Sequence, residues 1–284
     1  MATFPALRVI AQEIQTGSSD SVIALIDALI AQKTEEKKPA WIRELSKLKA
    51  FISGDVSSPW VIFNLDGNGK LPFAAFSSLP GVTCPGAGDC IKYCYSFRAW
   101  RYPAAFCRQA QNAWIMRNNP EIIAQAFQDI PQAIKTLRLY VDGDFSSVRD
   151  VSFWMELIRA RPNLDVYGYS KSFRELLAYD DALAYGQSWP TNYLLNLSGG
   201  HAHAAHIVEE MKALPITRGT FDAVSIGRKV KASEHGTKTT NKALVTIAGK
   251  GIFPCPGRCG DCRKGDHACG SEKLRGIPIV IAVH

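Results

Sequence analysis

The sequence lacks an apolar run long enough to form a signal-peptide core or a membrane-spanning helix. Met1 to Gly17 contains no such run, and the best apolar stretch, Val22 to Ala31, is interrupted by Asp27. The chain also lacks the composition of a disordered polymer, a collagen or a coiled coil, because 46% of its 284 residues are apolar and only 21% are charged. We therefore expect a folded cytoplasmic protein with no membrane partner.

Acidic residues are the scarcer charged class. Twenty-six Asp and Glu face 33 Lys and Arg, which leaves a formal net charge of +7. Such an excess favours a polyanionic partner through counterion release, although it is also common in proteins without one. Nucleic acid is therefore a plausible partner, and composition alone does not decide the matter.

Hydrophobic periodicity divides the chain into two parts. Between residues 19 and 52 apolar side chains recur at helical spacing, which predicts one helix beginning near Ser19 and a second beginning near Ala40. From residue 60 the pattern changes to two strands, 60–65 and 71–76, around the turn sequence Asp66-Gly67-Asn68-Gly69. We expect a helical appendage at 1–58 and an α/β unit at 59–284.

Beyond the hairpin, predicted strands and helices alternate with a spacing of about 28 residues, which suits βα units with a parallel sheet. The expected strands are 137–141, 164–169, 193–197, 223–226, 243–248 and 277–283. The expected helices are 104–118, 120–134, 148–160, 173–185 and 204–213. This number of units favours a full or partial parallel (β/α) barrel over an open sheet.

Eight cysteines form two groups, and clustered cysteines in a reducing compartment are more often metal ligands than disulfides. The later group, Cys255, Cys259 and Cys262, has the spacing C-x3-C-x2-C, and Cys269 follows in the same Gly-rich segment, 251–270. Four thiolates this close predict a closed site for an iron–sulfur cluster or for zinc. His267 is the alternative to Cys269 as the fourth ligand.

The earlier group, Cys84, Cys90 and Cys94, has the spacing C-x5-C-x3-C. Three cysteines on one loop predict an iron–sulfur cluster of the 4Fe-4S type, with one iron free for a substrate or cofactor. Cys107 lies on a predicted helix and is either a fourth ligand or an ordinary buried thiol. A zinc site completed by Cys107 or by a distant residue is the alternative.

Side chains that follow the predicted strands are candidates for the chemistry, because the carboxyl ends of parallel strands line the site in α/β folds. The candidate catalytic residues are Asp142, Asp144, Tyr169 and Lys171, and the candidate cofactor-binding residues are Ser198, Gly199 and Gly200. Two carboxylates facing a lysine could form a proton-transfer pair. Alternatively, Asp144 caps the helix that begins near Ser147 and pairs with Lys171.

Two further patterns have weaker implications. His201, His203 and His206 could ligate a metal, but we interpret them as an exposed start of a helix because no carboxylate or cysteine lies close in sequence. Arg228, Lys229 and Lys231 stand among Gly, Ser and Thr residues, a composition suited to phosphate contacts with nucleic acid. It is equally suited to a solvated loop.

Several motifs together carry a family resemblance. They are Thr83-Cys84-Pro85-Gly86-Ala87 with Cys90 and Cys94-Tyr95, then Arg98, Tyr102-Pro103, Arg108, Gly143-Asp144-Phe145-Ser146, Trp154, Ile158, Pro162, Tyr167-Gly168-Tyr169-Ser170-Lys171-Ser172, and the cysteine-rich end. In this combination the chain resembles the phage and mobile-element gene-product-88 family. The resemblance implies a cluster-binding α/β protein from a phage or plasmid but no activity, and the chain departs from it in the N-terminal helical pair and between residues 200 and 250.

A weaker resemblance is to radical S-adenosylmethionine enzymes, which also place a three-cysteine loop on a partial barrel. Their C-x3-C-x2-C spacing occurs here at the wrong end of the chain, and Asp261 stands where an aromatic residue is usual. S-adenosylmethionine as a cofactor therefore has little support.

Two classes of function follow. In the first, the protein is a metal-cluster enzyme that modifies nucleic acid or a nucleotide. In the second, it is a non-catalytic, metal-stabilised regulatory protein that binds nucleic acid or another protein. The open three-cysteine loop opposite Asp142 and Lys171 favours the enzyme.

Overall fold

A single sheet organises the molecule. The computed structural model describes residues 4–184, 187–262 and 267–283, and its eight strands follow the order β1-β2-β3-β4-β5-β6-β8-β7. The strands are β1 (Phe63–Asn64), β2 (Ala74–Phe76), β3 (Thr136–Leu139), β4 (Asp165–Ser170), β5 (Tyr193–Ser198), β6 (Thr217–Val224), β7 (Phe253–Pro254) and β8 (Ile279–Ala282). β1 pairs antiparallel with β2, and the other neighbours run parallel. The expectation of a mostly parallel α/β fold is confirmed.

A closed barrel is not shown. Within the described residues β1 and β7 lie at opposite ends of the strand order, and no pairing between them closes the sheet. Both strands are only two residues long, and Pro254 in β7 has no N–H to donate to a further strand. Each is therefore suited to an edge.

Ten α-helices are described. They are α1 (Pro5–Thr16), α2 (Ser19–Glu35), α3 (Pro39–Ile52), α4 (Cys90–Tyr93), α5 (Pro103–Asn118), α6 (Pro120–Gln128), α7 (Val148–Arg159), α8 (Phe173–Asp181), α9 (Ala205–Ala213) and α10 (Lys238–Ala248). Four 3-10 helices, η1 (Tyr95–Arg101), η2 (Ala232–Glu234), η3 (Ala268–Gly270) and η4 (Glu272–Leu274), complete the described helical elements. None of the described helices is long and apolar enough to cross a membrane.

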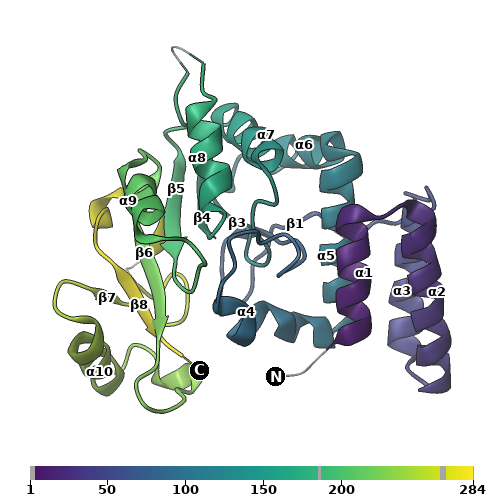
Figure 1. The fold of residues 1–284 in the computed structure, drawn as a ribbon, viewed down its shortest axis with the longest axis horizontal. Helices are drawn as coiled ribbons and strands as arrows, with labels where there is room; N and C mark the ends of the chain where they lie inside the picture. Colours follow the sequence, from purple (N-terminus) through teal and green to yellow (C-terminus); the bar gives the residue numbers. More distant parts are fainter. Residues whose placement is uncertain (1–3, 185–186, 263–266, 284) are drawn as a thin grey trace.

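The N-terminal helices form a block at one end of the molecule, far from β6, β8 and α10 (Figure 1). α1, α2 and α3 pack with α5 around a shared apolar cluster that includes Ile10, Ile26, Leu48 and Phe106. Helices α2 and α3 match the two helices expected from the sequence, whereas α1 was not expected. The signal was present, because the buried side chains of α1 recur at helical spacing after a proline in its first turn.

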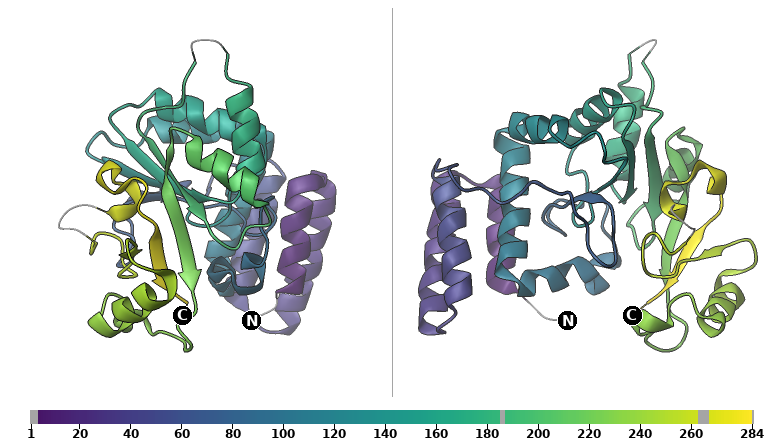
Figure 2. Two further views of the ribbon diagram at one scale, coloured as in Figure 1. Left: turned by 60° about the vertical axis from the view of Figure 1, so that its left-hand side comes forward. Right: turned by 180° about the vertical axis from the view of Figure 1, so that it is seen from behind.

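The outer face of the sheet is covered by α7, α8 and α9. Alternate strand residues such as Leu139, Val166 and Leu195 pack against Trp154 of α7 and Phe173 of α8. Figure 2 shows these helices on one side of the strands, with the segment after β7 on the other side. The period-two alternation of the strands therefore separates two different layers.

The inner face is covered by the cysteine-rich segment. Tyr167 and Leu194 point to this side and pack with Ala268, Cys269 and Ile279. The same segment reaches the β1–β2 hairpin, because the Cys259 N–H donates to the carbonyl of Lys70 at 2.8 Å. A segment with few apolar residues of its own is thereby held on the aromatic inner face of the sheet.

The strand predicted at 243–248 is wrong, because these residues belong to helix α10. Thr237 caps this helix by accepting from the Thr240 N–H, and Thr240 and Leu244, four residues apart, are both buried. A short apolar run does not distinguish a strand from a buried helix, and the cap was the missed signal.

The strand predicted at 223–226 corresponds to β6, which begins earlier, at Thr217. The first residues of β6 are polar, so the prediction from apolar alternation began this strand too late. α6 and α8 also end before the predicted residues 134 and 185, and residue 185 lies outside the described residues.

Candidate metal centres at the mouth of the sheet

The first cysteine loop lies at the carboxyl ends of the parallel strands. The N–H groups of Gly88 and Cys90 donate to the carbonyl of Gly200, just after β5, at 3.2 and 3.1 Å. Ala87 forms an isolated β-bridge with His201. The loop therefore sits at the end of the sheet where α/β proteins place their sites.

Close packing at this point requires glycine. A Cβ on Gly86 would overlap the carbonyl oxygen of Lys171, and a Cβ on Gly200 would collide with the Tyr93 hydroxyl. Gly200 also has a φ of 73°, which disfavours other residues. Gly200, expected to bind a cofactor, thus allows the loop to approach the sheet. A Cβ on Gly199, the other glycine of that expectation, would instead collide with the carboxylate of Asp222.

Asp144 and Lys171 lie beside this loop. Lys171 donates its backbone N–H to Asp144 Oδ2 at 2.7 Å and its ammonium to the Ser198 hydroxyl at 2.7 Å. Burial raises the pKa of the Cys84 thiol, and the Asp144 charge raises it further, while Lys171 opposes both effects. Burial also raises the pKa of Cys90, again opposed by Lys171. The structure therefore brings Asp144, Lys171 and Ser198 to the cysteine loop.

Asp144 is a well-satisfied buried carboxylate. Besides the Lys171 N–H, it accepts from the Ser170 hydroxyl at 2.7 Å and from the Phe145 N–H at 2.9 Å. The cap of α7 is Ser147, not Asp144. Burial raises the pKa of Asp144, and these hydrogen bonds oppose the rise. The carboxylate ties the loop after β3 to the end of β4.

Asp142 faces a different set of partners. Gln109 donates to its Oδ2 at 3.0 Å, and the hydroxyls of Ser96 and Ser77 also bond to it. Burial raises the pKa of Asp142, while Arg138 and Arg108 lower it. Its backbone carbonyl accepts from Ser78. Asp142 thus links the end of β3 to η1 and α5, the two helices that follow the cysteine loop in the chain.

Tyr169 lies on the inner face, beside the second cysteine group. The Arg138 guanidinium lies 4.6 Å from the centre of its ring, and its hydroxyl hydrogen bonds to Cys269. Arg138 also donates to the hydroxyl of Tyr95, the residue directly after Cys94, at 3.4 Å. Sequence reasoning missed Arg138 and Tyr95. The signal for Arg138 was a lone cation between Leu137 and Leu139, which are both buried on the opposite face of β3.

The second cysteine group lies on this same inner face. The pKa of Cys255 is raised by burial to about 12, with further increases from the thiols of Cys269, Cys262 and Cys259. The pKa of Cys269 is raised to about 11, first by burial. Four thiols from one short segment thus lie close enough to influence one another. His267, the alternative ligand, contacts the ring of Tyr167.

The donor chemistry of both groups fits a metal–thiolate centre. Among the described residues, no three His, Cys, Asp or Glu side chains already have the geometry of a metal site. Backbone N–H groups nevertheless point at the sulfurs: Gly257 donates to Cys255 at 3.4 Å, and backbone groups also bond to Cys84 and Cys90. Such bonds stabilise the thiolate form of cysteine, which burial without a metal disfavours.

Cys107 lies apart from both groups. It is fully buried in α5, within the cluster formed by the N-terminal helices. Burial raises the pKa of its thiol, and the charged groups that affect it are Glu44 and Lys47. The structure does not bring it to Cys84, Cys90 and Cys94 as a fourth ligand.

Two of the three histidines contact residues that follow β4. His203 bonds through Nε2 to the Lys171 carbonyl at 2.6 Å and stacks on Phe173, with ring centres 4.7 Å apart. His201 also contacts Phe173. Both precede α9, whereas His206 lies on its exposed face. The predicted start of a helix is correct for His206 only.

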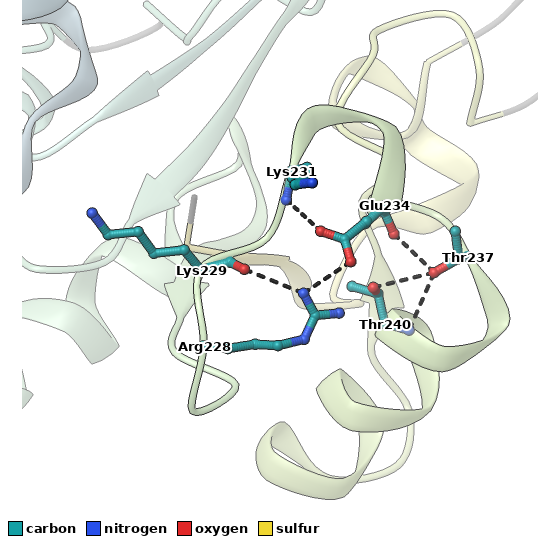
Figure 3. Close-up of polar contacts among 6 residues, drawn as sticks. All are labelled: Arg228, Lys229, Lys231, Glu234, Thr237 and Thr240. Atoms are coloured by element: carbon teal, nitrogen blue, oxygen red, sulfur yellow. Dashed lines mark hydrogen bonds and ion pairs between the residues drawn. The ribbon is translucent and has the colours of Figure 1, made fainter.

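The loop that carries Arg228, Lys229 and Lys231, termed the basic loop, is partly neutralised by Glu234 (Figure 3). Arg228 forms an ion pair with Glu234 at 2.9 Å, and Glu234 also accepts from the Lys231 N–H at 2.7 Å. The Lys229 ammonium points away from this network in Figure 3. Lys229 and Lys231 are both exposed. Two of the three predicted phosphate contacts thus present ammonium groups to solvent.

A cavity of about 360 Å³ lies behind the mouth, between α1, α5 and the first turn of α7. Thr83, next to Cys84, forms part of its wall and accepts from the Asp144 N–H at 3.2 Å. Gln12 and Thr16 of α1 form the opposite wall. The unexpected helix α1 therefore shapes a polar space next to the cysteine loop.

Comparison with known proteins identifies one family. A family model described as Gene product 88 matches residues 32–271. No curated protein and no solved structure matches the chain. The match spans both cysteine groups and every strand except β8.

Proposed function

Because the chain belongs to the Gene product 88 family, we propose that it is a phage- or plasmid-type metal–thiolate enzyme acting on nucleic acid or a nucleotide. Cys84, Cys90 and Cys94 hold an iron–sulfur cluster of the 4Fe-4S type in this proposal. Cys255, Cys259, Cys262 and Cys269 hold a second cluster or zinc. The observation that carries the proposal is the contact between the first cysteine loop and the strand ends, where Lys171 and Asp144 lie beside Cys84.

A cluster held by three thiolates supplies an iron with a free coordination position for binding or reducing a substrate. The residues of this chain shape the surroundings. Ser198 holds the Lys171 ammonium at the strand end, where it can attract an anionic substrate. In this proposal Tyr169 forms a wall of the site, and the Arg138 guanidinium lies over its ring.

Phosphate contacts in this proposal come from the basic loop. Lys229 and Lys231 are exposed, and Glu234 orders the loop through Arg228. Phosphate contacts by lysine position a nucleic acid without reading its sequence. This loop follows β6, a neighbour of β5 in the sheet, so it flanks the end where the first cysteine loop lies.

One observation favours the non-catalytic alternative. The carboxylate of Asp144 already accepts three hydrogen bonds, so a structural role accounts for it without proton transfer. In this alternative both cysteine groups stabilise a protein that binds nucleic acid or another protein.

Metal analysis of cysteine variants tests the proposal. We expect anaerobically purified protein to contain iron and acid-labile sulfide and to show the broad visible absorption of an iron–sulfur cluster. Cys90→Ser and Cys259→Ser should each lose part of the metal, and they should affect different centres. Cys107→Ser is the matched control and should retain the full content, because Cys107 lies among the N-terminal helices. Protein with neither iron nor zinc would end the proposal, and protein with zinc alone would favour the structural alternative.

The enzymatic part needs its own test. Reduced, metal-loaded protein is incubated with a mixed pool of oligonucleotides and nucleotides, and the products are examined by mass spectrometry. We expect a mass change that depends on the metal and is lost in Lys171→Met. Metal-loaded protein that binds the pool but never alters a mass would leave the binding protein as the better description.

A further inference from the structure

Exposed apolar side chains gather beside the first cysteine loop. Among the described residues eleven large apolar side chains are exposed, and four of them lie between positions 91 and 102. They are Ile91, Tyr93, Tyr95 and Tyr102, exposed by 39, 47, 50 and 68%. The four include all three tyrosines among the eleven. Exposed aromatic rings along one short segment, from α4 through η1 to the start of α5, are typical of an interaction surface, which we term the tyrosine rim.

The hydroxyl ends of two rings of the rim face the sheet. Tyr95 donates to the carbonyl of Val141 at 2.9 Å and accepts from Arg138 at 3.4 Å. The Tyr93 hydroxyl lies over Gly200, where a Cβ would collide with it. Tyr95 is therefore anchored by hydrogen bonds and Tyr93 packs on the Gly200 backbone, while much of each ring remains accessible. Anchored rings lose little side-chain entropy when a planar ligand stacks on them.

The charge of the rim favours a polyanion. Residues 91–102 contain Lys92, Arg98 and Arg101 and no acidic side chain. Lys92 pairs with Asp89 at 2.6 Å in a fully solvated setting, where such pairs exchange readily. A second copy of this positive surface would be repelled by the first. A strand with negative phosphates and planar bases matches both the charge and the rings.

We propose that the tyrosine rim binds single-stranded nucleic acid by stacking unpaired bases on Tyr93 and Tyr102. Arg101 contacts the phosphates beside them. Stacking at Tyr93 brings a base next to Cys90, whose Cβ lies against the same Gly200. The inference rests on the nucleic-acid partner of the proposed function and adds to it the strandedness and the recognising residues.

Fluorescence anisotropy of a labelled oligothymidine and of a matched duplex tests the proposal on the anaerobically purified full chain. We expect the single strand to bind more tightly than the duplex. Tyr93→Leu and Tyr102→Leu should each weaken single-strand binding by about fivefold or more, the range of one lost base stack. Tyr93→Phe and Tyr102→Phe keep the ring and should bind like the original protein.

The control is Ile122→Ala, an exposed apolar residue on α6 that should not affect binding. Thermal unfolding and iron content of each variant show that fold and metal are retained. Unchanged binding in both leucine variants would overturn the stacking proposal, while a persisting salt dependence would leave the nucleic-acid partner intact. Absence of any binding at low salt would remove the nucleic-acid partner itself, and with it this inference. A dimer that the leucine variants dissociate would identify the rim as a protein interface instead.

Discussion

The buried side chain of Arg218 offers a sharp test of how the second cysteine group is held. Arg218 is fully buried in β6. Its Nε donates to Asn196 Oδ1 at 2.6 Å, its Nη1 donates to the carbonyls of Leu274 and Ile277, and its Nη2 donates to that of Thr220. Asn196 in turn donates to the carbonyl of Cys269 at 2.9 Å. The guanidinium therefore orients the amide that holds the fourth cysteine.

Arg218→Met keeps the side-chain length and removes every donor. Four acceptors lose a partner, and at about 1 kcal/mol for each net bond the free energy of unfolding should fall by roughly 4 kcal/mol. Removing a buried charge makes this loss of unfolding free energy smaller. Each carbonyl that stays buried and unpaired makes it larger. We therefore expect a fall of about 3–5 kcal/mol and a lower metal content of the second group.

Urea unfolding followed by tryptophan fluorescence measures the first effect, and metal analysis measures the second. Lys212→Met is the control, because Lys212 forms only an exposed pair with Glu209 and should cost less than about 1 kcal/mol. A loss below about 1 kcal/mol in Arg218→Met, with unchanged metal, would refute the reasoning that this network positions Cys269.

Two further predictions concern charge. Burial raises the pKa of Asp150 above its usual 3.8, and its bonds to Ser146 oppose the rise. The folded state then holds a proton that the unfolded chain has released, so the contribution of Asp150 to stability falls as pH rises from about 3.8 through its folded pKa. Asp150→Asn should remove that part of the slope in urea titrations from pH 4 to 7, and an unaltered slope would contradict the burial argument. In nucleic-acid binding, Lys229→Gln and Lys231→Gln should each reduce the salt dependence by about one counterion, whereas Arg228→Gln should change it less because Arg228 pairs with Glu234; equal effects would contradict this.

Local sequence signals were sufficient wherever one element decides its own structure. The apolar periodicity of α2, α3 and α7 and the alternation of β4 and β5 are visible along the chain, because each element must bury one face. The clustering of Cys255, Cys259, Cys262 and Cys269 is likewise a property of a short segment. The family resemblance, confirmed over residues 32–271, rested on such local motifs.

Only the tertiary structure decided how distant segments meet. It placed the first cysteine loop against Lys171 and Gly200, buried Cys107 among the N-terminal helices, and set Arg138 against Tyr95 and Tyr169. It also made 243–248 part of a helix and gave β6 a polar start, because Arg218 finds its partners more than 50 residues away, at Leu274 and Ile277. A sequence pattern records which face of an element is apolar. The partner of a buried charge or thiol depends on contacts that form only when the sheet is assembled.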